Sequence, residues 1–255
     1  MKQFIVLLKK ELMELYRTKK ILILGAVFLF FTILSPLTAH FMPDIIEMIG
    51  QQDQDIIIII PDPTAIDSYL QFISNFGQIT VFVMIIVLAP LIVEEKRKGT
   101  FHTLLNNKVT KTNFVLAKVI SQIKVVTVLY AFSVGIFLLY TMILFDQILI
   151  TNWHLFFISI YLYYIFLICL INLISVVTKT NIMSITFSLL AFFGIIVFNY
   201  IPVVGKYLPS NLMNIATKVI VDNDYIKYIP INYVSSILIC FALVVAAIRL
   251  CSYED

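Results

Sequence analysis

LFFISIYLYYIFLICLINLISVVT, at residues 155–178, is an unbroken run of 24 residues without Asp, Glu, Lys or Arg. A helix rises 1.5 Å per residue, so about 20 apolar residues cross the ~30 Å hydrocarbon layer of a membrane. The segment is therefore long and apolar enough to span a bilayer. Five more charge-free segments lie before and after it, at residues 21–42, 69–93, 125–145, 182–204 and 231–248.

The composition supports the same interpretation. The 255 residues are 61% apolar and 13% charged, whereas a soluble domain is about one quarter charged. All 18 basic and 15 acidic residues lie outside the six segments, where a charge would cost roughly 2.5–3.5 kcal/mol to bury in lipid. We predict an all-α integral membrane protein with six transmembrane helices in a single domain, residues 1–255. The three Cys suggest no disulfide framework, and a net charge of +3 is too small to indicate nucleic-acid binding.

The basic residues predict the orientation. Fifteen of them lie before the first segment, at 94–124, at Lys179 and at Arg249, and the other three lie in the loop before the last segment. Positive loops stay in the cytoplasm, so we expect both termini on the cytoplasmic side of the cell membrane. The first apolar segment is too long for a cleaved signal peptide and lacks a small-residue cleavage site.

Residues 1–20 are expected to form an amphipathic helix in the membrane interface. Its apolar residues recur at helical spacing, and its charged residues share the other face: Phe4, Leu8, Leu12 and Leu15 on the first, and Lys10, Glu14 and Arg17 on the second. The alternative is a simple basic flank before the first span.

Residues 94–124 are too charged to enter the membrane and are predicted to form a cytoplasmic helix–turn–helix. Gly99 would end the first helix, and Thr100 would cap a short amphipathic helix. A turn at 109–111 would then lead to a helix that starts at Asn113. On the opposite side, Asp62 or Thr64, with Asp67, would cap the helix entering the second span, and 212–219 would form a short amphipathic helix.

Catalytic and metal-binding motifs are absent from the sequence. It has no nucleotide-binding loop and no His-Glu-x-x-His, so we assign no catalytic or metal-binding residue. Glu94-Glu95 could open the Glu-Glu-x-x-x-Arg motif of a membrane protease, but Gly99 occupies the Arg position. The predicted spans also lack the ionisable residue that proton-coupled carriers and channels usually place in the membrane. The energy for transport would then come from a separate ATPase.

Uncharged polar residues inside the spans are candidates for a translocation pathway, because such groups need polar partners in lipid. We select four of them: Asn75, Gln78, Ser184 and Asn199. The alternative for the Ser and Thr side chains is a bond back to a carbonyl of their own helix.

The topology and one motif together resemble the membrane subunit of ABC-2-type ATP-binding-cassette exporters. Residues 95–105 are similar to the family's Glu-Lys-Glu-Lys-Gly-Thr-Leu-Glu-x-Leu-Leu element, which precedes and forms its coupling helix. The matching positions, with departures at Arg97 and His102, give the expected ATPase-coupling residues: Glu95, Arg97, Gly99, Thr100, Phe101, Leu104 and Leu105. Residues 62–69 also resemble the entry to the second span in such permeases from Gram-positive bacteria.

The resemblance implies a homodimer or heterodimer of six-span subunits. Each subunit would be bound by a cytoplasmic ATPase that binds ATP and Mg²⁺. Alternating access at the dimer interface would export an amphipathic or apolar substrate, such as a peptide toxin, antimicrobial, drug or lipid-like molecule. The competing hypothesis is a membrane anchor or sensor that docks an ATPase without transporting anything. An alternative for Phe101, Leu104 and Leu105 is packing within this chain.

Overall fold

The computed structural model describes residues 2–50, 62–100, 109–146, 150–199, 201, 205, 207–221 and 229–251. Every regular element in these ranges is a helix, which confirms the predicted all-α class. Six candidate membrane spans are long and apolar enough to cross a bilayer. The predicted coupling residues Phe101, Leu104 and Leu105 lie outside the described ranges.

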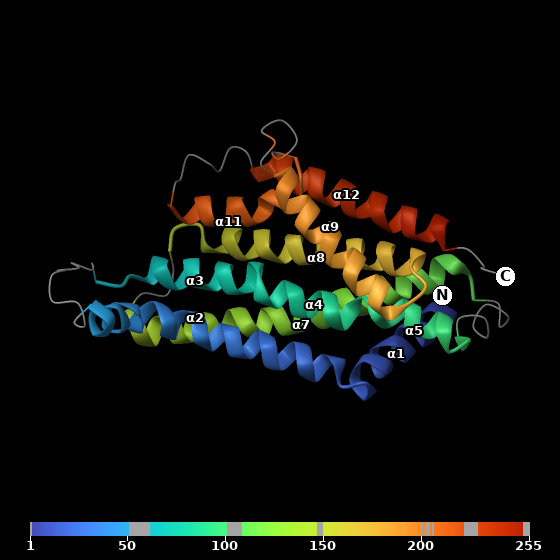
Figure 1. Ribbon diagram of the computed structural model, residues 1–255, viewed down its shortest axis with the longest axis horizontal. Coiled ribbons are helices and arrows are strands. Elements are labelled where there is room, and N and C mark those ends of the chain that lie inside the picture. The colour runs from blue at the N-terminus through green and yellow to red at the C-terminus, as the bar shows by residue number, and fades with distance from the viewer. Residues whose placement is uncertain are drawn as a thin grey trace.

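The long helices lie side by side in a bundle, with the short α11 beside α8 (Figure 1). The chain ends lie at one end of this bundle, which we call the terminal end; the opposite end is the far end. The described helices are α1 (Lys2–Arg17), α2 (Lys20–Gly50), α3 (Ala65–Gly77), α4 (Ile79–Leu88), α5 (Pro90–Arg97), α7 (Lys111–Phe145), α8 (Trp153–Val177), α9 (Asn181–Phe198), α11 (Asn211–Val221) and α12 (Ile229–Leu250).

Each predicted span corresponds to one of the six candidate spans, but several are longer than the charge-free segment. The third is α7, whose 35 residues extend over about 52 Å, far more than a ~30 Å hydrocarbon layer. Its first turns therefore project beyond the apolar layer at the terminal end. The predicted cytoplasmic segment 94–124 accordingly begins in α5 and ends in α7.

The core of the bundle is rich in aromatic residues around α8. Tyr69 contacts Phe137 and Phe156 at ring-centroid distances of 4.9 and 5.2 Å, and Phe72 stacks on Phe76 at 4.0 Å. These side chains are fully or almost fully buried. Edge-on and offset ring contacts favour one packing arrangement, so this cluster fixes α3, α7 and α8 against one another.

The second span is interrupted twice, giving α3, α4 and α5. The first break lies at Gln78, which has φ −114° and ψ −77°, and the second at Ala89 before Pro90. Proline cannot donate a backbone hydrogen bond and disturbs the preceding helical turn. Side chains of other helices bond to carbonyls beside both breaks: Tyr164 Oη donates to Phe76 O over 2.9 Å, and two serines donate to Ala89 O.

The described helix ends confirm several local predictions. Thr64 donates from its backbone N and its Oγ1 to Asp67 Oδ2, each over 2.8 Å, at the start of α3. Gly99 has φ +71°, a conformation that favours glycine, and follows the end of α5. α11 buries the apolar face that its spacing predicts, through Leu212, Ile215, Ala216 and Val219.

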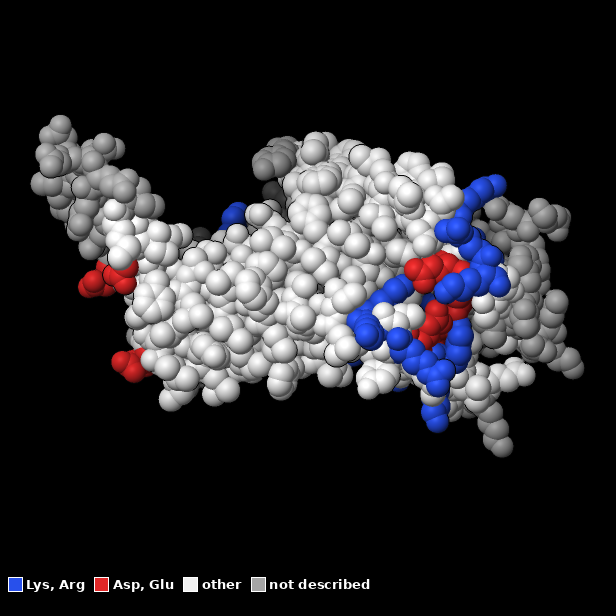
Figure 2. Space-filling model, turned by 60° about the horizontal axis from the view of Figure 1, so that its bottom comes forward, with Lys and Arg blue, Asp and Glu red and all other residues white. Residues whose placement is uncertain are grey.

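Charge is concentrated at the two ends of the molecule. Figure 2 shows basic and acidic side chains gathered at the terminal end, acidic side chains at the far end, and a middle band that on this face is almost free of charge. The uncharged band is the part that would lie in the hydrocarbon layer. This distribution agrees with the segregation seen in the sequence.

Candidate functional site

The short helix α5 lies at the terminal end and makes polar contacts with several other helices there. It begins at Pro90, is followed by Gly99, and leads directly into the predicted coupling helix. Its residues Leu91, Ile92 and Val93 are buried, while Arg97 is exposed. Polar contacts join α5 to helices on both sides.

On one side, α5 joins a cluster of charged residues, three of them buried and two half-buried, which we call the ion cluster. It comprises Lys10, Glu11 and Glu14 of α1, Glu95 of α5, and Lys118 of α7. Lys118 Nζ lies 2.5 Å from Glu11 Oε2, 3.2 Å from Glu95 Oε1 and 3.7 Å from Glu14 Oε2. Lys10 pairs with Glu11, Glu14 and Glu95. The cluster thus ties the N-terminal helix to both helices that flank the predicted coupling element.

Burial makes these pairs matter more than surface ion pairs. Lys118 is 1% exposed, Glu11 2% and Glu95 3%, so the charges have little water to compensate them. Burial opposes the charge of Lys10, but Glu11 and Glu95 hold its pKa above the ordinary 10.5. Burial likewise favours protonated Glu14, but Lys118 and Lys10 hold its pKa below the ordinary 4.5. Both charged forms are therefore stabilised by the cluster.

The same carboxylates are the described residues best placed to hold a cation. Oxygens of Glu11, Glu14 and Glu95 lie within 4.8 Å of one another. The ammonium group of Lys118 already lies within ion-pair distance of all three. The arrangement therefore serves as an internal salt-bridge cluster and gives no reason to assign a metal.

On its other side, α5 is attached to α8 and α9. Ser175 Oγ of α8 and Ser184 Oγ of α9 donate to the Ala89 carbonyl over 2.6 and 2.8 Å. Lys96 Nζ donates to the carbonyl of Val176. A third link, from Lys20 Nζ to Glu94 Oε1 over 3.3 Å, joins α5 to the start of α2. Because α5 makes polar contacts with helices on both sides, a displacement of α5 would be transmitted to α1, α7, α8 and α9.

A second feature lies on α3, where one helical face is polar and not covered by the rest of the chain. Its members are spaced at i, i+4, i+7 and i+11, which places them in one row. We call this row the polar face; it consists of Asp67, Gln71, Ser74 and Gln78. Gln71 is half-buried and the other three are exposed, whereas the large side chains exposed on α9 are apolar.

The four predicted pathway residues do not share this polar face. Gln78 belongs to it, at the break between α3 and α4. Asn75 is 7% exposed and its Nδ2 donates to Ser35 Oγ of α2 over 2.9 Å. Ser184 is fully buried, and its Oγ donates a hydrogen bond to the carbonyl of Ala89. Asn199 Oδ1 accepts a hydrogen bond from Ser210 Oγ over 2.7 Å. Three of the four therefore bond within this chain, and a role for them in a pathway stays a prediction.

The predicted coupling residues are also distributed differently. Glu95 lies inside the ion cluster, so its contacts are internal, while Arg97 is exposed. Lys10 and Glu14, which belong to the charged face expected for residues 1–20, form ion pairs within the ion cluster.

Lys118 and Ser175 have no signal in the sequence, because their partners are 23 to 107 residues away. The polar face does have one: its i, i+4, i+7, i+11 spacing is visible in the sequence, but which face of α3 the fold leaves uncovered is not.

The geometry is that of a multi-pass helical membrane protein with a charged region at one end, where salt bridges join several helices. The chain belongs to the ABC-2 family of transporter proteins, whose family model matches residues 5–228. It is also similar to an uncharacterized transmembrane protein, YxlG, of Bacillus subtilis (strain 168), with 22% identity over 147 residues. That match covers 58% of this chain, and the chain spans 57% of the relative's length.

Proposed function

We propose that this chain is the membrane-spanning permease subunit of an ABC transporter, powered by a separate cytoplasmic ATPase that binds ATP and Mg²⁺. Family membership supports this proposal, as does the absence of acidic and basic residues from the central part of the described spans. The terminal end, with both chain ends and α5, would face the cytoplasm. We expect the cell membrane of a Gram-positive bacterium as the location.

The observation that carries the coupling part is the attachment of α5 on two sides. The predicted coupling helix follows Gly99, and α5 connects that position to α1 and α7 through Glu95 and to α8 and α9 through Ala89. An ATPase that pushes the coupling helix would therefore move α5 against the rest of the bundle. Pro90 provides the break about which α5 could tilt.

The polar face supports the transport path. An exposed Gln78 in the middle of a span would be costly against lipid, because its amide would lose its hydrogen bonds to water. We propose that a second copy or a paralogue covers this side, leaving a hydrated path along the polar face. Alternating access at that interface would move an amphipathic or apolar substrate out of the cell. A peptide toxin, antimicrobial, drug or lipid-like molecule would fit.

Reconstitution tests the proposal. The permease and its ATPase, purified together and placed in vesicles, should move substrate in one direction only when ATP is present. Substrate should also raise the rate of ATP hydrolysis. If neither effect appears while the ATPase stays bound, the chain is an anchor or sensor and the transport proposal fails.

A further inference from the structure

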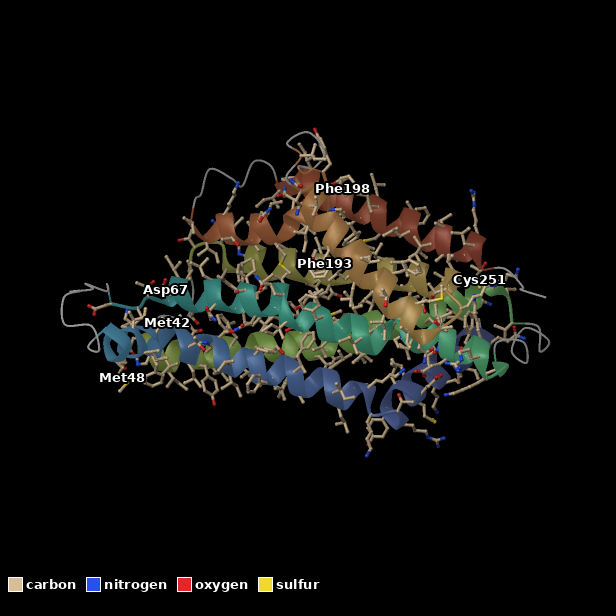
Figure 3. The ribbon with its side chains drawn as sticks, in the orientation of Figure 1. Met42, Met48, Asp67, Phe193, Phe198 and Cys251 are labelled. Atoms are coloured by element: carbon tan, nitrogen blue, oxygen red, sulfur yellow. The ribbon has the colours of Figure 1, made fainter. Side chains whose placement is uncertain are left out.

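A cavity of about 330 Å³ lies at the far end, between the last part of α2 and the first turns of α3. This volume is in the range of small-molecule binding sites. The described lining residues are Ala39, Met42, Pro43, Pro63, Asp67, Leu70 and Gln71. Met42 and Asp67 lie close together on facing helices at this end (Figure 3). The cavity is therefore where the polar face reaches the far end.

Most of the wall is apolar. Met42 and Leu70 supply flexible hydrophobic surface, and Pro43 and Pro63 supply rigid surface. Methionine adapts to differently shaped apolar groups, because it is unbranched and polarisable. Such a wall would hold the apolar part of a ligand without demanding one shape.

Asp67 contributes the only charged side chain of the described lining. Its Oδ2 accepts two bonds from Thr64, which fix the orientation of the carboxylate. Its Oδ1 has no hydrogen-bond partner within the described ranges. Asp44 and Asp62 are near the lining residues in the sequence, and both are exposed. Residues 43–68 contain no Lys or Arg. The electrostatic character of this site therefore favours a cation.

We propose that this cavity binds an amphipathic amine, whose ammonium group pairs with Asp67 and whose apolar body rests on Met42 and Leu70. Gln71, Ser74 and Gln78 continue from the site towards the middle of the membrane, so the cavity is the outer end of the proposed path. The inference rests on the proposed function for its role, because a substrate that leaves along the polar face would meet this site last. Binding itself needs neither ATP nor the ATPase.

The test compares two fluorescent probes on the full chain in phosphatidylcholine nanodiscs. One probe is a dansyl group with a five-carbon chain ending in a primary amine, and the other is its N-acetylated, uncharged form. We expect the amine to bind about fivefold more tightly, as an exposed ion pair allows. Asp67→Asn should abolish this preference, and Leu70→Trp should weaken binding of both probes by filling the cavity.

Two variants separate charge recognition from the structural role of Asp67. Thr64→Ala removes the Oγ1 bond to Asp67 at the start of α3 but keeps the backbone bond and the carboxylate, so the preference should persist. Asp62→Asn removes an exposed charge outside the cavity lining, so it should lower the preference far less than Asp67→Asn does. Equal binding of the two probes to the unmodified chain would overturn the inference, as would an unchanged preference in Asp67→Asn.

The outcome is independent of the transport test. Asp67-dependent binding without ATP-driven transport would sustain the site and refute the transporter proposal. Transport with no preference for the amine would do the reverse.

Discussion

Lys118 is the most buried residue of the ion cluster. Its ammonium group lies among three carboxylates, and the side chain is 1% exposed. Removal of one partner from a buried ion pair leaves charges without compensation and costs about 3–5 kcal/mol. We expect Lys118→Met to lower the thermal unfolding midpoint of the detergent-purified chain and to loosen α1.

The matched control is Lys124→Met, six residues further along α7, where the lysine is exposed and no ion pair holds it among the described residues. The thermal unfolding midpoint of that variant should be close to that of the unmodified chain, since surface substitutions usually change stability little. Equal midpoints for the two variants would show that the ion cluster does not stabilise the fold.

Glu14 makes the ion cluster sensitive to acid. Its pKa in the folded chain lies below 4.5, so its charge stabilises the folded state above pH 4.5, and this stabilisation is lost as the pH falls through the lowered pKa. Glu14→Gln should therefore be less stable than the unmodified chain at pH 7. The gap between their unfolding midpoints should narrow below pH 4.5, and a gap independent of pH would contradict this assignment.

The two serine links from α8 and α9 to the start of α5 converge on one carbonyl, that of Ala89. Because Ser175 and Ser184 both donate to it, their joint replacement by Ala removes two buried hydrogen bonds, each worth about 0.5–1.5 kcal/mol. We expect a lower unfolding midpoint and, in the reconstituted complex, less transport per ATP hydrolysed. Ser188→Ala is the control, because Ser188 Oγ is buried on the same α9 with no hydrogen-bond partner inside the described ranges. If Ser188→Ala lowered the unfolding midpoint and the transport per ATP by as much, the hydrogen bonds to Ala89 would have no special role.

The uncovered face of α3 should be in contact with water, and that of α9 with lipid. In a chain whose three cysteines are replaced by serine, Ser74→Cys should react with a charged, membrane-impermeant thiol reagent in the assembled complex. Phe187→Cys, on the exposed apolar face of α9, should react far more slowly, because thiolate formation and the reagent both require water. Equal labelling rates at the two positions would remove the basis for a hydrated path.

At the scale of the whole assembly, the contact to test is the one that we propose between the predicted coupling helix and the ATPase. Phe101→Asp combined with Leu105→Asp should release the ATPase during purification, because a charge would enter an apolar groove of the partner. Membrane insertion should not change, since the residues lie between spans. Insertion can be checked by fractionation, and normal co-purification of the ATPase would show that these side chains do not form the contact.

Hydropathy was sufficient to predict the helical class and the six spans. The spacing of apolar residues predicted the amphipathic face of α11, and residue type predicted the turn at Gly99 and offered Thr64 as one of two candidate caps. These features depend on interactions between residues a few positions apart, or on contact with lipid, which acts on each span separately. The same local rules placed Lys10 and Glu14 on one face of α1 but could not identify their partners on α5 and α7.

The ion cluster, the two serines on Ala89 and the uncovered side of α3 required the packed bundle. In each case a side chain meets groups that are 23 to 107 residues away or is left without them, and such pairings have no periodicity along the chain. A polar residue in a span must find a partner, but the partner depends on which helices are neighbours and how each is rotated. That is why Asn75 bonds to α2 while Gln78, three residues later, lies uncovered.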